Sequence, residues 1–290
     1  MTAQTAFTLI NPQTKELAFS IFEFEDDSYF KQQRVYNYYS MLLITEGKGK
    51  LTADFSEYTF HDQALLCFSV YQPFIIDAGQ LFKGILINFH PDFFCIHKHQ
   101  EEVACNGVLF NNIYHAPLIQ LQPEEMKGLL TLVSTIKAEM QNAAPAQYEL
   151  MVAYLKIFLI NASRLKITQQ PENVRTKGTE PFILKNLKDA IEEHYRRKHS
   201  PSDYAELLNI STKALNRISK THLNRTLSNL ITERLIIEAK RELYLTSKPV
   251  KSIAFELGFQ DEFYFSRFFK NNTEVSPQVY RSTVGFAKGE

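Results

Sequence analysis

The chain has 290 residues, and 32 Lys and Arg balance 32 Asp and Glu, so its formal charge at pH 7 is zero. A hydrophobic content of 44% and an aromatic content of 13% allow a buried core in about two domains and exclude a disordered or low-complexity chain. Apolar runs are too short to cross a membrane, Met1–Thr8 lacks the pattern of a secretory signal, and the three cysteines are not spaced as metal ligands. We therefore expect a cytoplasmic protein with reduced thiols and no membrane partner.

Roughly the first 115 residues predict an antiparallel β domain. Segments rich in β-branched and aromatic residues lie at 38–45, 50–55, 65–71 and 84–89. The turn signals between them are Glu46 to Gly49, Ser56-Glu57, Pro73 and Ala78-Gly79. Short strands at this spacing are typical of a barrel or a sandwich.

The hydrophobic period becomes helical after Pro123. Apolar residues from Met126 to Met140 repeat at helical intervals, and a second helix follows Pro145. Leu150 and Ile157 widen the apolar arc of this second helix, so we expect it to bury one face in its own domain and another against a second subunit. Phe158 is expected at that subunit interface.

The two halves of the chain carry opposite net charges. Residues 1–170 have a net charge of −5 and residues 171–290 a net charge of +5. A basic half favours a polyanion partner, although ordinary variation of surface charge would give the same numbers. Residues 168–180 predict a linker, and helices are expected from there to about Tyr280.

The basic half contains an internal repeat. Tyr204-Ala205, Leu208, Asn209 and Ile210 recur 49 positions later as Ile253-Ala254, Leu257, Gly258 and Phe259, and Leu215, Arg217, Ile218 and Lys220 recur 50 positions later as Phe265, Arg267, Phe268 and Lys270. Each copy reads as helix, tight turn, helix, with Asn or Gly at a bend that favours positive φ and with Ser211 or Asp261 as the cap of the second helix. This pattern predicts two helix-turn-helix motifs.

The second helix of each copy has an inner and an outer face. Leu215 and Ile218 point inward in the first copy; Phe265, Phe268 and Phe269 do so in the second. The outer faces carry Lys213, Asn216, Arg217 and Lys220 in the first copy and Glu262, Phe263, Ser266, Arg267 and Lys270 in the second. Arg can bond to guanine, Asn to adenine, and an exposed Phe can contact a thymine methyl. One copy alone could equally be a solvated surface helix, but two matched copies in the basic half favour DNA reading.

An apolar stripe between the copies, from Leu227 to Leu243, predicts a long connecting helix. About 20 residues at 1.5 Å each span about 30 Å. This length is close to the ~34 Å between successive major-groove faces of B-DNA. One chain could then read two adjacent major-groove segments.

These residues resemble the AraC/XylS family of transcriptional regulators. The match is strongest over Lys251 to Lys270 with Ser276-Pro277 and Tyr280-Arg281, which is similar to the second helix-turn-helix of the family. Arg234-Leu235 and Ala239-Lys240 resemble its connecting helix, and Leu215 to Arg217 its first recognition helix. The resemblance implies that Lys213, Asn216, Arg217, Glu262, Phe263, Ser266 and Arg267 contact bases. Lys220 and Lys270 suit phosphate contacts better.

Three departures from the family pattern stand out. Ser219 replaces a customary aromatic core residue, which predicts looser packing in the first copy. Asn224 and Glu274 replace the customary Gly after each recognition helix, and Glu tolerates that conformation poorly. Glu262 is acidic near DNA, so we expect the second copy to bind more weakly.

Histidines in the N-terminal half raise an alternative, a metal-dependent cupin enzyme with an appended helical domain. His97 and His99 have the spacing of metal ligands, with Glu101 and Glu102 nearby, but they lie in a polar run without strand character. His90 suits a structural turn, and His61-Asp62 lacks a nearby nucleophile. A protein-interaction module is the third interpretation.

The sequence thus favours an α+β protein that is a DNA-binding regulator and not an enzyme. By the family resemblance, residues 1–122 are expected to form a cupin-like antiparallel β-barrel sensor and 123–167 dimerisation helices. Residues 168–180 are expected to be a linker, and 181–290 an all-α domain of two helix-turn-helix motifs joined by a long helix. The expected partners are double-stranded DNA, a second copy of the chain through 123–167, a small-molecule effector in the barrel and, for an activator, RNA polymerase. The interpretation includes neither a cofactor nor a metal.

Overall fold

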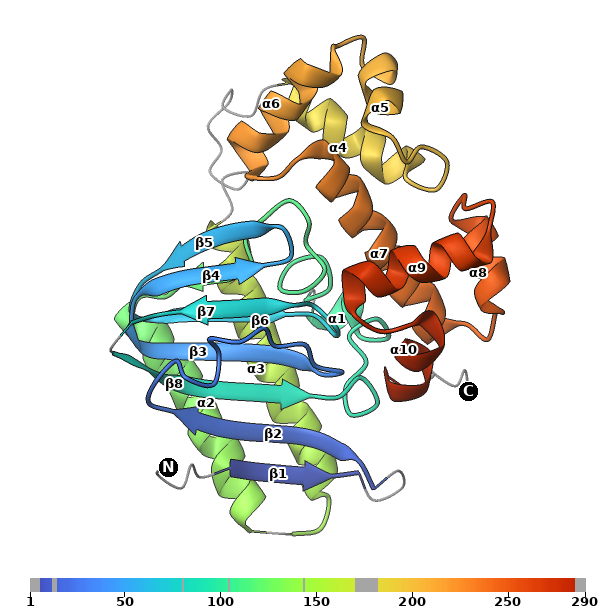
Figure 1. Ribbon diagram of the computed structural model, residues 1–290. Coiled ribbons are helices and arrows are strands. Elements are labelled where there is room, and N and C mark those ends of the chain that lie inside the picture. Colours follow the sequence, from blue (N-terminus) through green and yellow to red (C-terminus); the bar gives the residue numbers. More distant parts are fainter. Residues whose placement is uncertain are drawn as a thin grey trace. The chain divides into compact units, whose positions relative to one another are not determined.

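The computed structural model describes residues 6–11, 15–79, 81–103, 105–142, 144–169 and 182–284. The chain divides into two compact units, one of residues 1–112 and 116–173 and the other of residues 113–115 and 174–290 (Figure 1). Most of the predicted linker at 168–180 lies outside the described residues, as does most of Met1–Thr8; residues 168 and 169 still belong to helix α3.

The first unit is built on a six-stranded antiparallel sheet with strand order β1-β2-β8-β3-β6-β9. Its strands are β1 (Ala6–Ile10), β2 (Leu17–Phe24), β8 (Phe82–Phe89), β3 (Tyr39–Gly47), β6 (Ala64–Phe68) and β9 (Leu118–Gln120). Strand β3 is central, because Met41 pairs with Cys67 of β6 on one side and with Ile87 of β8 on the other. Its first six residues are all buried, which requires cover on both faces of the sheet.

A three-stranded sheet covers one of those faces. It comprises β5 (Ser56–Phe60), β4 (Gly49–Ala53) and β7 (Phe74–Asp77), in the order β5-β4-β7. Buried residues of both sheets form one core cluster, in which Phe68 of β6 stacks on Phe74 of β7 with 3.9 Å between the ring centroids. Aromatic rings therefore fill the space between the sheets.

Two long helices, α2 (Pro123–Gln141) and α3 (Gln147–Gln169), lie along the other face of the six-stranded sheet (Figure 1). Pro123 occupies the first turn of α2 as predicted, and the Glu125 side chain accepts a hydrogen bond from the Gln122 backbone N–H at 2.8 Å. A short helix, α1 (Gln100–Val103), contacts α3. The apolar face predicted for α2 is buried, since Met126, Leu129, Val133 and Ile136 are inaccessible.

The antiparallel β domain predicted from the sequence is confirmed, with two differences. The described strands hydrogen-bond as two separate sheets, so the predicted barrel is not closed. The predicted turn at Ser56-Glu57 is wrong: these residues begin β5, and the chain turns earlier, where Asp54 has a φ of +52°. Strands β1, β2, β5, β7 and β9 were not predicted from the sequence. Of these, β1 lies at an edge of the sheet, and its residues alternate between exposed and half-buried.

The second unit is helical throughout its described residues. After α4 (Phe182–His194), the first copy of the repeat comprises α5 (Pro201–Leu207) and α6 (Thr212–Leu223). The connecting helix is α7 (Leu227–Leu245), the second copy comprises α8 (Val250–Glu256) and α9 (Glu262–Thr273), and α10 (Pro277–Val284) follows. None of the described helices, in either unit, combines the length and the hydropathy that a transmembrane span needs.

Candidate DNA interface

The turn between the two helices of each copy adopts the predicted backbone. Asn209 has a φ of +53° in the first copy and Gly258 a φ of +83° in the second. A Cβ on Gly258 would lie 2.2 Å from the Arg196 carbonyl oxygen, so glycine is needed there for space as well as for conformation. The helix-turn-helix geometry predicted for both copies is therefore present.

Both recognition helices, α6 and α9, start at the predicted caps. The Ser211 hydroxyl accepts from the Ala214 N–H at 3.2 Å, and the Asp261 carboxylate accepts from the N–H groups of Phe263 and Tyr264 at 3.2 and 2.8 Å. In both copies a side chain at the cap satisfies N–H groups that have no partner within the helix. The second copy has one more residue between the turn and the cap than the first, since Asp261 follows Gly258 by three positions and Ser211 follows Asn209 by two.

The outer faces of α6 and α9 have nearly the same pattern of exposure. Of the residues predicted to meet DNA, Lys213, Arg217 and Lys220 are exposed and Asn216 is half-buried in the first copy, whereas Phe263, Arg267 and Lys270 are exposed and Glu262 and Ser266 are half-buried in the second. Phe263 is 71% exposed, so its ring is accessible to a binding partner. Each helix therefore presents a row of cationic, polar and, in α9, aromatic groups.

The inner faces of α6 and α9 pack inside their own copies. Leu215 of α6 and Phe265 and Phe269 of α9 are fully buried. Ile218 and Phe268, predicted to be core residues, are only half-buried; the Phe268 ring packs on Phe259 with 5.1 Å between centroids.

Ser219, the residue that replaces an aromatic in the first copy, is also fully buried, and its hydroxyl donates to the Arg225 carbonyl at 2.6 Å. In the second copy Thr273 donates to the equivalent carbonyl, that of Val275, at 3.1 Å. Ser219 thus makes a buried hydrogen bond in place of the packing that an aromatic residue would supply.

The connecting helix α7 has 19 residues and spans about 28 Å at 1.5 Å per residue. Its first turn is capped by Thr226, and its stripe of Leu227, Ile231, Leu235, Ala239 and Leu243 is buried as predicted. Because α7 contacts α4, α6, α8, α9 and α10, both copies pack against the same helix.

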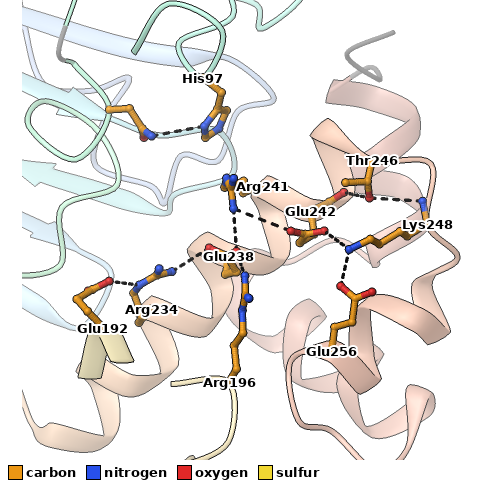
Figure 2. Close-up of polar contacts among 11 residues, drawn as sticks. His97, Glu192, Arg196, Arg234, Glu238, Arg241, Glu242, Thr246, Lys248 and Glu256 are labelled. Atoms are coloured by element: carbon orange, nitrogen blue, oxygen red, sulfur yellow. Dashed lines mark hydrogen bonds and ion pairs between the residues drawn. The ribbon is translucent and has the colours of Figure 1, made fainter. Parts of the chain in front are cut away.

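A charged network also fixes α7 in place (Figure 2). Glu238, which is 3% exposed, accepts from Arg196 at 2.6 Å, from Arg241 at 3.0 Å and from Arg234 at 3.2 Å, while Arg234 bonds to Glu192 of α4 at 2.8 Å. Burial alone would raise the pKa of Glu238, but the Arg196 hydrogen bond and the neighbouring guanidinium charges hold the pKa below its ordinary value. The carboxylate therefore stays ionised and paired.

A second buried charge, Arg225, distinguishes the first copy from the second. Its guanidinium pairs with Glu233 of α7 at 3.1 Å and donates to the Ile113 carbonyl, within the same unit. The equivalent residue of the second copy is Val275, 50 positions later. Arg225 was not identified from the sequence, although an arginine aligned with a valine in the repeat was the available signal.

Comparisons with known proteins place these helices in a family. A family model described as "Helix-turn-helix domain" matches residues 204–283. The regulatory protein SoxS of Salmonella typhimurium is 30% identical over 99 residues, which cover 34% of this chain and 92% of SoxS.

The chain belongs to the AraC/XylS family of transcriptional regulators.

Two further proteins are similar to this chain. The raffinose operon transcriptional regulatory protein RafR of Pediococcus pentosaceus is 34% identical over 113 residues, which span 39% of this chain and only 40% of RafR. The solved structure of ToxT from Vibrio cholerae aligns over 92% of this chain and 98% of its own at 15% identity, with a TM-score of 0.41. The family, with RafR and SoxS, consists of regulators and not of enzymes.

The histidines considered as metal ligands have local protein contacts. Within the described residues, no group of three or more His, Cys, Asp and Glu side chains could hold a metal ion. His97 lies 3.5 Å from the Asn106 amide, and His99 lies 3.4 Å from Glu102, which also pairs with Lys156. The Glu101 side chain lies outside the described part.

The remaining polar candidates of the first unit have structural surroundings. His90 is buried in a turn, where its Nδ1 accepts from the Asp92 N–H at 3.2 Å. Asp62 accepts from the Gly47 N–H, and His61 is exposed. The three cysteines are free thiols, and burial raises the pKa of Cys67 and of Cys105 to about 12, so neither is poised as a thiolate.

Proposed function

We propose that this AraC/XylS protein is a sequence-specific DNA-binding transcriptional regulator that reads two successive major-groove segments with α6 and α9. The observation that carries the proposal is the repeated pattern of exposure on these helices, with Arg217 and Arg267 at equivalent outward positions. Guanidinium groups there can bond bidentately to guanine O6 and N7.

The proposed contacts of α6 and α9 with DNA divide into two classes. We assign base reading to Lys213, Asn216, Arg217, Glu262, Phe263, Ser266 and Arg267, and phosphate contacts to Lys220 and Lys270, which lie one turn further along each helix. Glu262 can accept from cytosine N4 but repels phosphate, so the second copy would contribute less affinity than the first.

We further propose that the first unit senses a small molecule and acts in the cytoplasm as part of the same regulator. The space between the two sheets, where the effector was expected, is a poor place for it, because aromatic rings fill that space. A groove of about 410 Å³ beside α2 offers more room. Its lining includes Glu46, Gln63, Met126 and Lys127. Control would follow from the different affinity of the effector for two arrangements of the regulator.

A second copy of the chain is the partner we propose for α3, within the dimerisation segment 123–167. The expectation that Phe158 lies at this interface is wrong, since Phe158 is fully buried in its own unit. Leu150 and Ile157, seven residues apart on α3, are 38% and 44% exposed and supply the apolar contact instead. If the regulator activates transcription, RNA polymerase would be a further partner.

The proposal is tested by binding the full chain to duplexes selected from a random-sequence library. Affinity should fall steeply with salt, because lysines and arginines displace counterions from phosphates. Arg217→Ala and Arg267→Ala should each lose about 1–3 kcal/mol of discrimination at one base position, measured at fixed salt.

Lys220→Ala and Lys270→Ala are the matched controls, because loss of a phosphate contact weakens all sequences alike and lowers the salt slope by about one. Failure to enrich any sequence would refute DNA reading, and unchanged selectivity in both arginine variants would refute the residue assignment.

A further inference from the structure

The two copies of the repeat join the helix that follows them through equivalent contacts. At the start of α7, the Thr226 hydroxyl accepts from the Asn229 N–H at 3.2 Å. At the start of α10, 50 residues later, the Ser276 hydroxyl accepts from the Val279 N–H, also at 3.2 Å. The two junctions therefore use the same capping geometry, and a difference between them at one position is informative.

That difference is at the first residue of each helix. In the first copy this residue is Leu227, whose N–H has no acceptor within α7 and donates instead to the Asn216 side-chain oxygen at 2.9 Å. In the second copy it is Pro277, which has no N–H to donate. Ser266, the residue equivalent to Asn216, therefore has no counterpart of this bond to make.

The bond also limits what Asn216 can offer to DNA. An asparagine that reads adenine presents its amide oxygen and its NH₂ group together, one accepting from N6 and the other donating to N7. Since the Leu227 N–H is a donor, the amide atom that faces it must be the oxygen. The oxygen is engaged within the protein, and the NH₂ group alone is left as a donor.

We propose that Asn216 is a positioning residue that fastens α6 to α7, whereas Ser266 in the second copy stays available to a base. The inference rests on the proposed function and revises one assignment in it. Arg217, the next residue, is exposed, so holding Asn216 fixes the rotation of α6 about its axis and with it the direction of Arg217. Base reading by the first copy then falls to Lys213 and Arg217.

The test compares Asn216→Ala, Asn216→Asp and Ser266→Ala in the full chain. Asn216→Ala leaves the buried Leu227 N–H without its acceptor, so the unfolding midpoint should fall by roughly 4 °C. Asn216→Asp keeps a carboxylate acceptor beside the start of α7, so the midpoint should stay near that of the wild type. Ser266→Ala should leave the midpoint unchanged.

The second readout is the base preference of each variant on a random-sequence duplex library. Asn216→Asp should keep the wild-type preference at every position, with lower affinity overall. Asn216→Ala, which releases α6, should weaken the preference at the base that Arg217 reads, and Ser266→Ala should change the preference at one position. An unchanged midpoint in Asn216→Ala, or a preference lost at one base in Asn216→Asp, would overturn the inference. Absence of any selected sequence would refute DNA reading itself, while the midpoints would still report on the Asn216 contact.

Discussion

Glu274 ends the second recognition helix with a φ of +65°, and Asn224 ends the first with a φ of +55°. Left-handed backbone costs most side chains about 1 kcal/mol or more, but asparagine adopts it more readily. The family pattern has glycine at both positions, so the second copy carries strain that the first largely avoids.

Replacing Glu274 by glycine should therefore stabilise the protein. We expect Glu274→Gly to raise the free energy of unfolding by about 0.5–1 kcal/mol, because the strain relieved exceeds the added freedom of the unfolded chain. Asn224→Gly is the matched control and should change it by less than half as much. Urea denaturation of both variants measures the difference; equal effects would contradict the explanation.

Lys166 is a buried cation in α3, 7% exposed, whose ammonium group donates to the carbonyls of Ala116 and Leu118 at 2.6 Å each. Burial lowers its pKa to about 8 from the ordinary 10.5. Between these two values the unfolded chain binds the proton and the folded chain does not, so stability should rise with pH across this interval.

Denaturation at several pH values can isolate this contribution. Relative to Lys166→Met, the wild-type free energy of unfolding should increase by about 1–2 kcal/mol between pH 7.5 and pH 9.5. The comparison at each pH cancels the other titrating groups. A difference between the two proteins that does not vary with pH would show that Lys166 keeps an ordinary pKa.

Elements whose side chains follow one period were predictable from the sequence. Helices α2, α3, α6, α7 and α9 begin and end near the expected residues, because apolar spacing and caps are local signals. Strands β3, β4, β6 and β8 were also found. The short β9 was not, since it pairs with β6, more than 50 residues earlier in the chain. The edge strand β1 was also not predicted, although it pairs with the next strand, β2.

The rotation of α3 about its own axis could not be predicted from the sequence. Phe158 and Ile157 are adjacent and both apolar, yet the first is fully buried and the second is 44% exposed. A helix that is apolar around much of its circumference has no unique inward face until it packs on a sheet.

A subunit interface on α3 should therefore depend on Ile157. We expect Ile157→Glu to shift a dimer to monomer by placing a charge in an apolar contact, with the fold preserved. Phe158→Glu is the contrasting variant and should unfold the first unit instead. Sedimentation velocity at low concentration, together with circular dichroism, separates the outcomes; a dimer that persists in Ile157→Glu would exclude this face.

At the scale of the whole molecule, the length of α7 sets the distance between the two readers. About 28 Å of buried helix is stiff, and it approaches the ~34 Å repeat of the major groove. Reading by one chain should therefore require a fixed spacing between the two segments of the DNA site.

Insertion of base pairs into a selected duplex tests this requirement. Five added pairs turn the second segment to the opposite side of the helix, and affinity should fall at least about tenfold. Ten added pairs return the second segment to the original side of the DNA but double the distance between the two segments, so affinity should not recover. Recovery with ten pairs would mean that flexibly joined readers, and not α7, set the spacing.

The sequence by itself determined the repeat, the two helix-turn-helix motifs, the outward position of Arg217 and Arg267 and the family, because each depends on residues close together in the chain. Only the tertiary structure decided that Asn216 bonds to Leu227, that Arg225 and Glu238 are buried ion-pair centres, and that Phe158 is core. These features depend on which faces meet, and such contacts join residues whose separation in the sequence carries no periodic signal.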